Sequence, residues 1–298
     1  MYIKGSFKID KINNINGTLG QLEGRFAFIN QIDIFNRELK GENKYKDYKL
    51  QNLSSTEKQY QKFLFFRYFY GNPKPLIVTE GKTDIIYIKA DLKNLYTQYP
   101  ELIKKQNDGT FEFRVSFPRK SERLSYLLRI PLDGDTGLQN IYNYYSDKNG
   151  QFRNFSKTFR DDLKVKSRNP VFLLFDNESV ASKKPRPLRK FINYADLKQG
   201  RIDTLLNTRM LNISNNLYVL TVPLINGNTE CEIEDLLDQS TLNYMKDGKT
   251  FRRDEKEFND AKHYGKKIFS EYINENYLII NFSNSKEVLD NIESAIIR

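Results

Sequence analysis

Two short apolar runs that each end in acidic residues place the strongest constraint on how this chain can fold. The run 76–78 is followed by Glu80, and the run 171–175 is followed by Asp176 and Glu178. Short apolar runs without polar alternation are typical of parallel strands buried on both faces. Open α/β sheets place ligands at the carboxyl ends of such strands, so we expect an acidic site there.

A helix is predicted directly after the first run. Gly81 permits a tight turn, Thr83 or Asp84 can cap a helix, and apolar residues at helical spacing fill 85–92. The same pattern is also typical of an ordinary strand–turn–helix in which Glu80 is merely solvated. The second run shifts the balance toward a functional acidic site.

Side chains two apart in an extended segment point the same way, so Asp176 and Glu178 are expected to converge. If the two strands are neighbours, Glu80 joins them in an acidic cluster. Carboxylate oxygens are ligands suited to Mg²⁺ or Mn²⁺, which take their other ligands from water and phosphates. The sequence therefore predicts a divalent-metal site at this sheet edge.

The rest of the chain after residue 73 alternates strands with helices, which indicates an α/β fold with a mostly parallel sheet. We expect a half-buried strand at 111–117 and a later strand at 217–222. The turn 131–137 precedes a helix. Asp133 and Asp135 in that turn either add to the acidic site or only cap the helix.

Residues 1–72 are predicted to form a largely helical region. The segment 19–39 approximates an amphipathic helix, and Ser54 with Glu57 resembles the start of a second helix that ends before 71–73. This region is either an adapter that docks a polymerase or nucleic acid through its aromatics and Arg67, or a core-forming helical pair.

Composition narrows the function classes. The net charge of +10 favours a polyanionic partner such as nucleic acid, although a Lys- and Asn-rich composition also produces it. A single cysteine, Cys231, excludes internal disulfides and cysteine zinc sites, and the single histidine, His263, leaves little basis for histidine-dependent hydrolases. No apolar run is long enough to span a membrane and the start is not a signal peptide, so a cytoplasmic protein without a membrane partner is expected.

Basic residues near the acidic motifs are the candidate nucleic-acid contacts. The segment 183–190 follows the second acidic motif, and a charged stretch, 251–267, lies near the C-terminus. Each is either a phosphate-binding surface or a solvated loop or helix face. The candidate nucleic-acid-binding residues are Lys82, Lys183, Lys184, Arg186, Arg189 and Lys262.

The motif 80–84, Glu-Gly-Lys-Thr-Asp after a strand, and the later Asp-x-Glu motif resemble the TOPRIM domain of topoisomerases, bacterial primases and OLD-family nucleases. The closer resemblance is to retron reverse transcriptases that carry a C-terminal TOPRIM domain. The segment 22–33 is similar to the end of such a polymerase and 62–72 to the bridge that follows it. Further similar segments are 132–136, 232–237 and 263–269.

Two departures from that family stand out. The second motif is Asp-Asn-Glu where Asp-x-Asp is commoner, which lengthens one ligand by a methylene. The Tyr-x-Asp-Asp motif of the polymerase is absent, so the chain is either the product of a split gene or a fragment of a fusion.

The resemblance implies a TOPRIM-like, mostly parallel sheet flanked by helices at 73–298, with a C-terminal helical elaboration and an N-terminal helical adapter at 1–72. It also implies a Mg²⁺-dependent (or Mn²⁺-dependent) nuclease, the effector of a retron antiphage system. The expected partners are nucleic acid and the retron reverse transcriptase with its DNA–RNA hybrid (msDNA). The implied catalytic residues are Glu80, Asp84, Asp176, Glu178 and Lys266, and the implied metal ligands are Glu80, Asp84, Asp176, Glu178 and Glu234.

Two other function classes remain open at this point. One is a non-catalytic module that binds nucleic acid and the reverse transcriptase and keeps a residual acidic metal site. The other is a nucleotidyl transferase, for which the single cysteine offers no zinc-binding module. The sequence leaves open whether the substrate is DNA or RNA, whether one or two ions bind, the oligomeric state and the trigger of activity.

Overall fold

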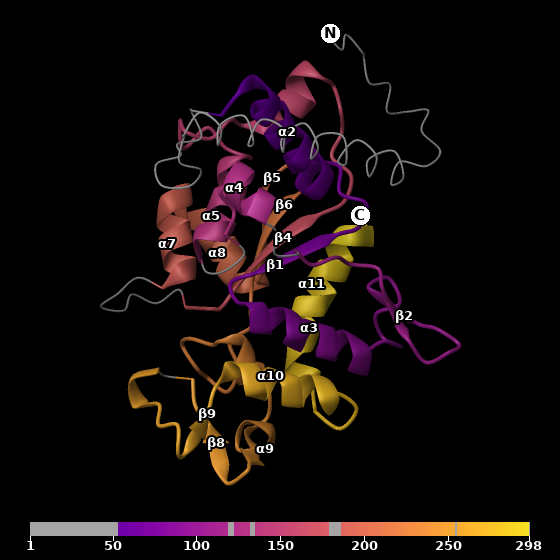
Figure 1. Cartoon of the computed structure of the whole chain (residues 1–298), viewed down its shortest axis with the longest axis vertical. Coiled ribbons are helices and arrows are strands. Elements are labelled where there is room, and N and C mark those ends of the chain that lie inside the picture. The colour runs from indigo at the N-terminus through magenta and orange to yellow at the C-terminus, as the bar shows by residue number, and fades with distance from the viewer. Residues whose placement is uncertain (1–52, 119–121, 132–134, 179–185, 254, 298) are drawn as a thin grey trace, which may run out of the picture.

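The computed structural model describes residues 53–118, 122–131, 135–178, 186–253 and 255–297. At its centre lies a four-stranded sheet in the order β1-β4-β6-β5 (Figure 1). Strands β1, β4 and β6 are parallel, and β5 joins the edge antiparallel to β6. The predicted α/β class with a mostly parallel sheet is confirmed. The bounds are β1 Leu76–Thr79, β4 Val171–Phe175, β5 Met210–Ser214 and β6 Leu217–Thr221.

The strand residues alternate between two hydrophobic cores, one on each face of the sheet. Val78 and Leu173 belong to the first core, whereas Ile77 and Phe172 belong to the second. Because both faces are covered, every residue of β4 is buried, which explains its continuous apolar sequence.

Helices cover both faces and give the molecule three layers (Figure 1). The first core is covered by α2 (Ser55–Phe65), α4 (Glu122–Leu128), α5 (Asp135–Asn143), α7 (Pro187–Ala195) and α8 (Gln199–Thr208). The second core is covered by α3 (Lys82–Asn94), α10 (Lys266–Glu275) and α11 (Lys286–Ile297).

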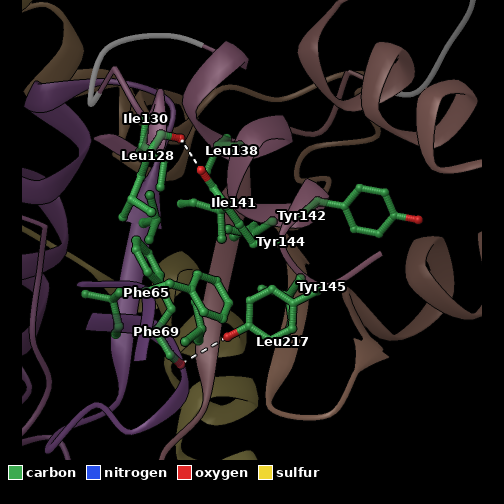
Figure 2. Close-up of a cluster of buried hydrophobic side chains, with 14 of the residues drawn as sticks. Phe65, Phe69, Leu128, Ile130, Leu138, Ile141, Tyr142, Tyr144, Tyr145 and Leu217 are labelled. Carbon is green, nitrogen blue, oxygen red and sulfur yellow. Dashed lines mark hydrogen bonds between the residues drawn. The ribbon is translucent and has the colours of Figure 1, made fainter. Parts of the chain in front are cut away.

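The first core is rich in aromatic rings (Figure 2). The ring of Phe65 packs 5.2 Å from that of Tyr145 and 5.3 Å from that of Tyr144 between centroids. The buried Tyr145 hydroxyl donates to the carbonyl oxygen of Phe69 at 3.0 Å. Residues 53–72 therefore pack into the same core as the sheet. The predicted helix at 19–39 lies outside the described residues.

The second predicted helix begins where the sequence indicates. Ser54 caps α2: the backbone N–H of Glu57 donates to the Ser54 hydroxyl at 3.2 Å, and the backbone N–H of Ser54 donates to the Glu57 carboxylate at 2.8 Å. The helix continues as a π-helix, Phe66–Tyr70, and ends at Gly71. The aromatic side chains of this region pack mainly in the core, which agrees with the interpretation as a core-forming helical pair.

The prediction of one strand at 111–117 is only partly right. Strand β3 covers Phe111–Phe113 and pairs with β2 (Ile103–Lys105) in a separate antiparallel hairpin. Ser116 instead lies beside β1, since its backbone N–H donates to Pro75 at 2.7 Å and its carbonyl accepts from Ile77 at 2.9 Å. The chain bends between the two pairings, which a single alternating pattern does not reveal.

A small three-stranded sheet interrupts the chain between β6 and α10. It consists of β7 (Met245–Lys246), β8 (Lys249–Phe251) and β9 (His263–Tyr264). The C-terminal elaboration therefore contains strands as well as the expected helices. Within the described residues, no helix is both long and apolar enough to cross a membrane.

The remaining helices are short. They are α6 (Phe155–Lys157), α9 (Gln239–Leu242), a π-helix Thr158–Asp162, and 3-10 helices Ile233–Leu236, Glu255–Glu257 and Ser283–Ser285.

Candidate acidic site

The carboxyl ends of β1 and β4 bring Glu80 and Asp176 together. Thr79, the last residue of β1, is paired with Leu174 of β4, so both strands end at the same edge of the sheet. The Glu80 Oε1 atom accepts a hydrogen bond from the backbone N–H of Asp176 at 3.1 Å. The sequence predicts that these two acids are neighbours, and the structure places them so.

Asp176 is the centre of the acidic site. Its Oδ1 atom accepts from the backbone N–H of Ile233 at 2.9 Å, which ties the end of β4 to the 3-10 helix Ile233–Leu236. Burial raises the pKa of Asp176 well above its usual range, and the negative charge of Glu80 raises it further, as do those of Asp84 and Glu234. Negative charge therefore concentrates where the second strand ends.

Asp84 has two roles in the structure. Helix α3 begins at Lys82 with Gly81 as its N-cap, and the Asp84 Oδ2 atom accepts from the backbone N–H of Gly81 at 2.8 Å. Burial raises the pKa of Asp84, while the bond from Gly81 and the charge of Lys266 lower it. Asp84 thus holds the first turn of α3 while its charge acts on Asp176.

Glu234, a predicted metal ligand, is paired with Lys266. The Lys266 Nζ atom lies 3.1 Å from Glu234 Oε1 and 3.1 Å from Glu232 Oε2. Glu234 is fully buried; burial raises its pKa and Lys266 opposes that rise. Burial alone lowers the pKa of Lys266, but the charges of Glu234 and Glu232 outweigh it and raise that pKa. Lys266 is therefore an ammonium held inside the acidic site by two carboxylates.

Arg253 is a second cation of the site, and sequence reasoning missed it. Its Nη1 atom lies 2.7 Å from Asp235 Oδ1 and 3.8 Å from Glu232 Oε2. The chain carries 48 lysines and arginines, and nothing in the spacing distinguishes this one. The acidic segment 232–237 indicates only that some cation lies nearby.

Glu178 contacts Arg186 across the segment that follows β4. The Arg186 Nε atom lies 3.3 Å from Glu178 Oε1, and the Glu178 side chain is buried. Burial raises the pKa of Glu178 and the guanidinium of Arg186 lowers it. The charge of Glu232 raises the pKa of both Glu178 and Asp176, while the convergence of their side chains stays a prediction.

The predicted nucleic-acid contacts are spread over several elements. Lys82 is exposed at the start of α3, Lys262 is exposed just before β9, and Arg189 is half-buried on α7. Arg186 is an ion partner of Glu178 with about half of its side chain exposed. Residues outside the described part of the chain are Lys183, Lys184 and Asp133, while Asp135 is the first residue of α5.

The carboxylates suit a hard cation in chemistry, because their oxygens are the donors that Mg²⁺ prefers. In the described part of the chain, however, no three or more His, Cys, Asp or Glu side chains stand in a geometry that could hold a metal ion. Mg²⁺ commonly binds through one or two carboxylates and completes its shell with water and phosphate oxygens. The pair formed by Glu80 and Asp176 fits that mode.

A cavity of about 250 Å³ lies away from this site. Tyr142, Asp196, Arg201 and Ser214 are among the residues that line it, and none of the acidic-site residues does. The Nη2 atom of Arg201 donates to the carbonyl of Asn212 at 2.6 Å. The charges concentrate at the sheet edge instead.

Comparison with known proteins adds no identification, since no protein-family model matches the chain and no solved structure matches it at a significant level.

Proposed function

We propose that this protein is a TOPRIM-like, metal-dependent enzyme that cleaves phosphodiester bonds. The observation that carries the proposal is the contact between Glu80 and Asp176 at the ends of two adjacent parallel strands. Acidic side chains crowded together raise one another's pKa, an arrangement that costs stability and is typical of functional sites.

In the proposed reaction, the chain's own residues bind the cation and stabilise charge. Glu80 and Asp176 hold it, and Asp84 lies close enough to act on the same charge. Mg²⁺ or Mn²⁺, when bound, supplies Lewis-acid polarisation of the phosphate and activation of water. The Lys266 ammonium stabilises the negative charge that develops at the scissile phosphate. Glu234 and Glu232 keep its ammonium protonated and oriented.

Glu80 also has the chemistry of a general base. A carboxylate next to a cation remains ionised, so it accepts a proton only from a water held within hydrogen-bond reach. Its Oε1 atom is already engaged by the Asp176 backbone, which fixes the orientation of the carboxylate.

The proposed biological role is that of an effector in a retron antiphage system, with the reverse transcriptase and its DNA–RNA hybrid as partners. The support is the sequence resemblance at 22–33 and 62–72 together with the motifs 80–84 and 176–178. The segment 62–72 packs into the first core, as expected of a bridge continuous with the sheet.

A second candidate is a non-catalytic nucleic-acid-binding module. Two predicted ligands, Glu234 and Glu178, are already paired with Lys266 and Arg186. Such ion pairs are expected in a site that has lost its metal and in which basic side chains now neutralise the former ligands.

The deciding experiment incubates the purified chain with single- and double-stranded DNA and RNA, with Mg²⁺, with Mn²⁺ and with EDTA. Cleavage is expected only with a divalent ion, and Glu80→Gln and Asp176→Asn are expected to reduce it at least about a hundred-fold while binding persists. Glu112→Gln, an exposed change on β3, is the matched control. Cleavage that survives both site variants rules out the enzyme proposal, and binding without any cleavage favours the second candidate.

A further inference from the structure

Helix α3 carries a row of lysines that starts at the acidic site. Lys82, Lys89 and Lys93 are separated by seven and four residues, so they share one face of the helix. At 1.5 Å per residue the row extends about 17 Å. Figure 1 shows α3 running from the end of β1 toward the β2–β3 hairpin, so the row leads away from Glu80.

Aromatic rings of the hairpin strand and the segment after it lie against this row. The Lys89 ammonium is 5.1 Å from the ring centroid of Phe117 and 5.9 Å from that of Phe113. The two rings meet edge to face at 6.3 Å. Phe111 and Phe113 lie on the same side of β3 because they are two residues apart, and Glu112 points to the other side.

A second group of rings lies at the far end of α3. The Lys93 ammonium is 5.3 Å from the ring centroid of Tyr277, and the Lys105 ammonium is 5.4 Å from that of Tyr96 and 5.8 Å from that of Phe111. Phe111 meets Tyr96 at 5.7 Å and Tyr277 at 6.0 Å, both edge to face. Tyr96, Phe111 and Tyr277 pack against the second core but are only half-buried, so part of each ring remains accessible.

These residues form what we call the lysine–aromatic track. Its rings are half-buried, unlike the fully buried rings of the first core such as Phe65 and Tyr144. Among the described residues, no carboxylate lies within 4.0 Å of the ammonium groups of Lys89, Lys93 or Lys105. The track comprises Lys82, Lys89, Lys93, Lys105, Tyr96, Phe111, Phe113, Phe117 and Tyr277.

Three cations of the track, Lys89, Lys93 and Lys105, are available to an external anion. Lys93 donates to the neutral amide oxygen of Asn274 at 2.9 Å, which leaves its charge uncompensated. Burial lowers the pKa of Lys93, and the neighbouring charge of Lys89 lowers it further. An anion placed between the two would relieve that repulsion.

We propose that the lysine–aromatic track binds single-stranded nucleic acid and directs it to the acidic site. Lysines along a path contact successive phosphates, and aromatic faces stack on bases of any sequence. Single-stranded DNA and RNA offer the same chemistry, whereas a duplex keeps its bases stacked inside. The destination of the strand rests on the proposed function; the binding itself does not.

The first test measures binding of labelled oligo-dT and oligo-U of about 20 nucleotides to the full chain by fluorescence anisotropy in EDTA. The triple variant Lys89→Gln, Lys93→Gln and Lys105→Gln is expected to bind at least about ten-fold more weakly. The slope of log K against log salt should fall by about 2 in magnitude, since about 0.7 is lost for each phosphate contact to a single strand.

A matched control carries the same charge change elsewhere, at the exposed residues Lys148, Lys198 and Lys246. It is expected to bind nearly as well as the parent chain. Equal weakening in the two triple variants, or unchanged binding by the track variant, overturns the proposal. Competition by duplex as strong as by single strands also overturns it.

The rings are tested separately with Tyr96→Leu and Phe111→Leu, which keep apolar bulk but remove the stacking faces. Each is expected to weaken binding about ten-fold, with melting temperatures that confirm folding. Unchanged affinity in both folded variants contradicts the assigned role of the rings. Glu80→Gln is expected to bind like the parent chain and to lose cleavage, so cleavage that persists in this variant with intact track binding refutes only the enzymatic proposal.

Discussion

The carboxylate of Glu80 accepts a hydrogen bond of 3.1 Å from the backbone N–H of Asp176, so the end of β1 orients the end of β4. This bond places two acids close together at one sheet edge. Their proximity is unfavourable for folding, and the following prediction measures that cost.

Asp176→Asn is expected to stabilise the fold at pH 8 while abolishing the proposed activity. The neutral amide keeps an oxygen for the backbone N–H of Ile233 and removes the repulsion from Glu80. A gain of about 1 kcal/mol in the free energy of unfolding is expected, because the neutral amide removes both the cost of burying a charge and the repulsion from neighbouring acids. Urea denaturation provides the measurement. A stability loss above about 1 kcal/mol would show that Asp176 is mainly structural.

Lys266→Met is expected to destabilise the chain by about 3 kcal/mol, because it leaves the fully buried Glu234 without its cation. Glu234→Gln in the same chain should restore most of that loss. The double-mutant cycle, followed by chemical denaturation, measures the coupling energy. Additive effects of the two substitutions would contradict the pairing described above.

Asp91 is expected to make stability depend on pH. It is buried on α3, and burial raises its pKa to about 8, with a smaller opposing effect from Ser285. Its unfolded pKa is near 4, so its contribution is fully present below pH 4 and is lost as the pH rises toward 8. The expected slope is about 1.4 kcal/mol for each pH unit in that window.

Asp91→Asn removes the proton exchange and should flatten this slope, which thermal melting between pH 5 and pH 8 measures. Asp247→Asn is the matched control, because Asp247 is exposed in a positive-φ turn that Asn adopts equally well. The same slope in the Asp91→Asn variant as in the parent chain would assign the pH dependence to other groups.

Gly137→Ala is expected to destabilise the chain by more than about 2 kcal/mol. A Cβ atom there would lie 2.2 Å from the carbonyl oxygen of Pro131, so the backbone would have to move. Gly200→Ala, inside α8, meets nothing within 4 Å and should stabilise by about 0.5–1 kcal/mol through helix propensity. Melting temperatures that shift in the same direction for both variants would contradict the close packing at Gly137.

The central sheet was predictable because burial on both faces forces an apolar sequence. The run 171–175 coincides with β4 residue for residue. The capping residues Ser54 and Glu57 mark the start of α2. The proximity of Glu80 to Asp176 followed from the rule that parallel strands end at one edge. The strand and the helix start depend on local pattern alone, whereas the meeting of the two acids also requires β1 and β4 to be neighbours, which the sequence pattern did not determine.

The remaining features depend on contacts between distant segments. Arg253 and Asp235 are separated by a segment with little regular secondary structure, and the ion-pair partner of an arginine leaves no periodic pattern in the sequence. Strand β5 lies at the sheet edge and mixes buried with exposed residues, so no continuous apolar run in the sequence predicts it. The bend at Ser116 arises because a second partner, β1, competes with β2 for the same segment.

The position of Lys266 has a consequence for how the protein is made. The carboxylates at 80, 176 and 234 leave the ribosome well before this lysine, which begins α10 close to the end of the described chain. Until α10 docks beside Glu234, a nascent chain carries this acid without its ion-pair partner, so premature termination before residue 266 should yield a product that is rapidly degraded.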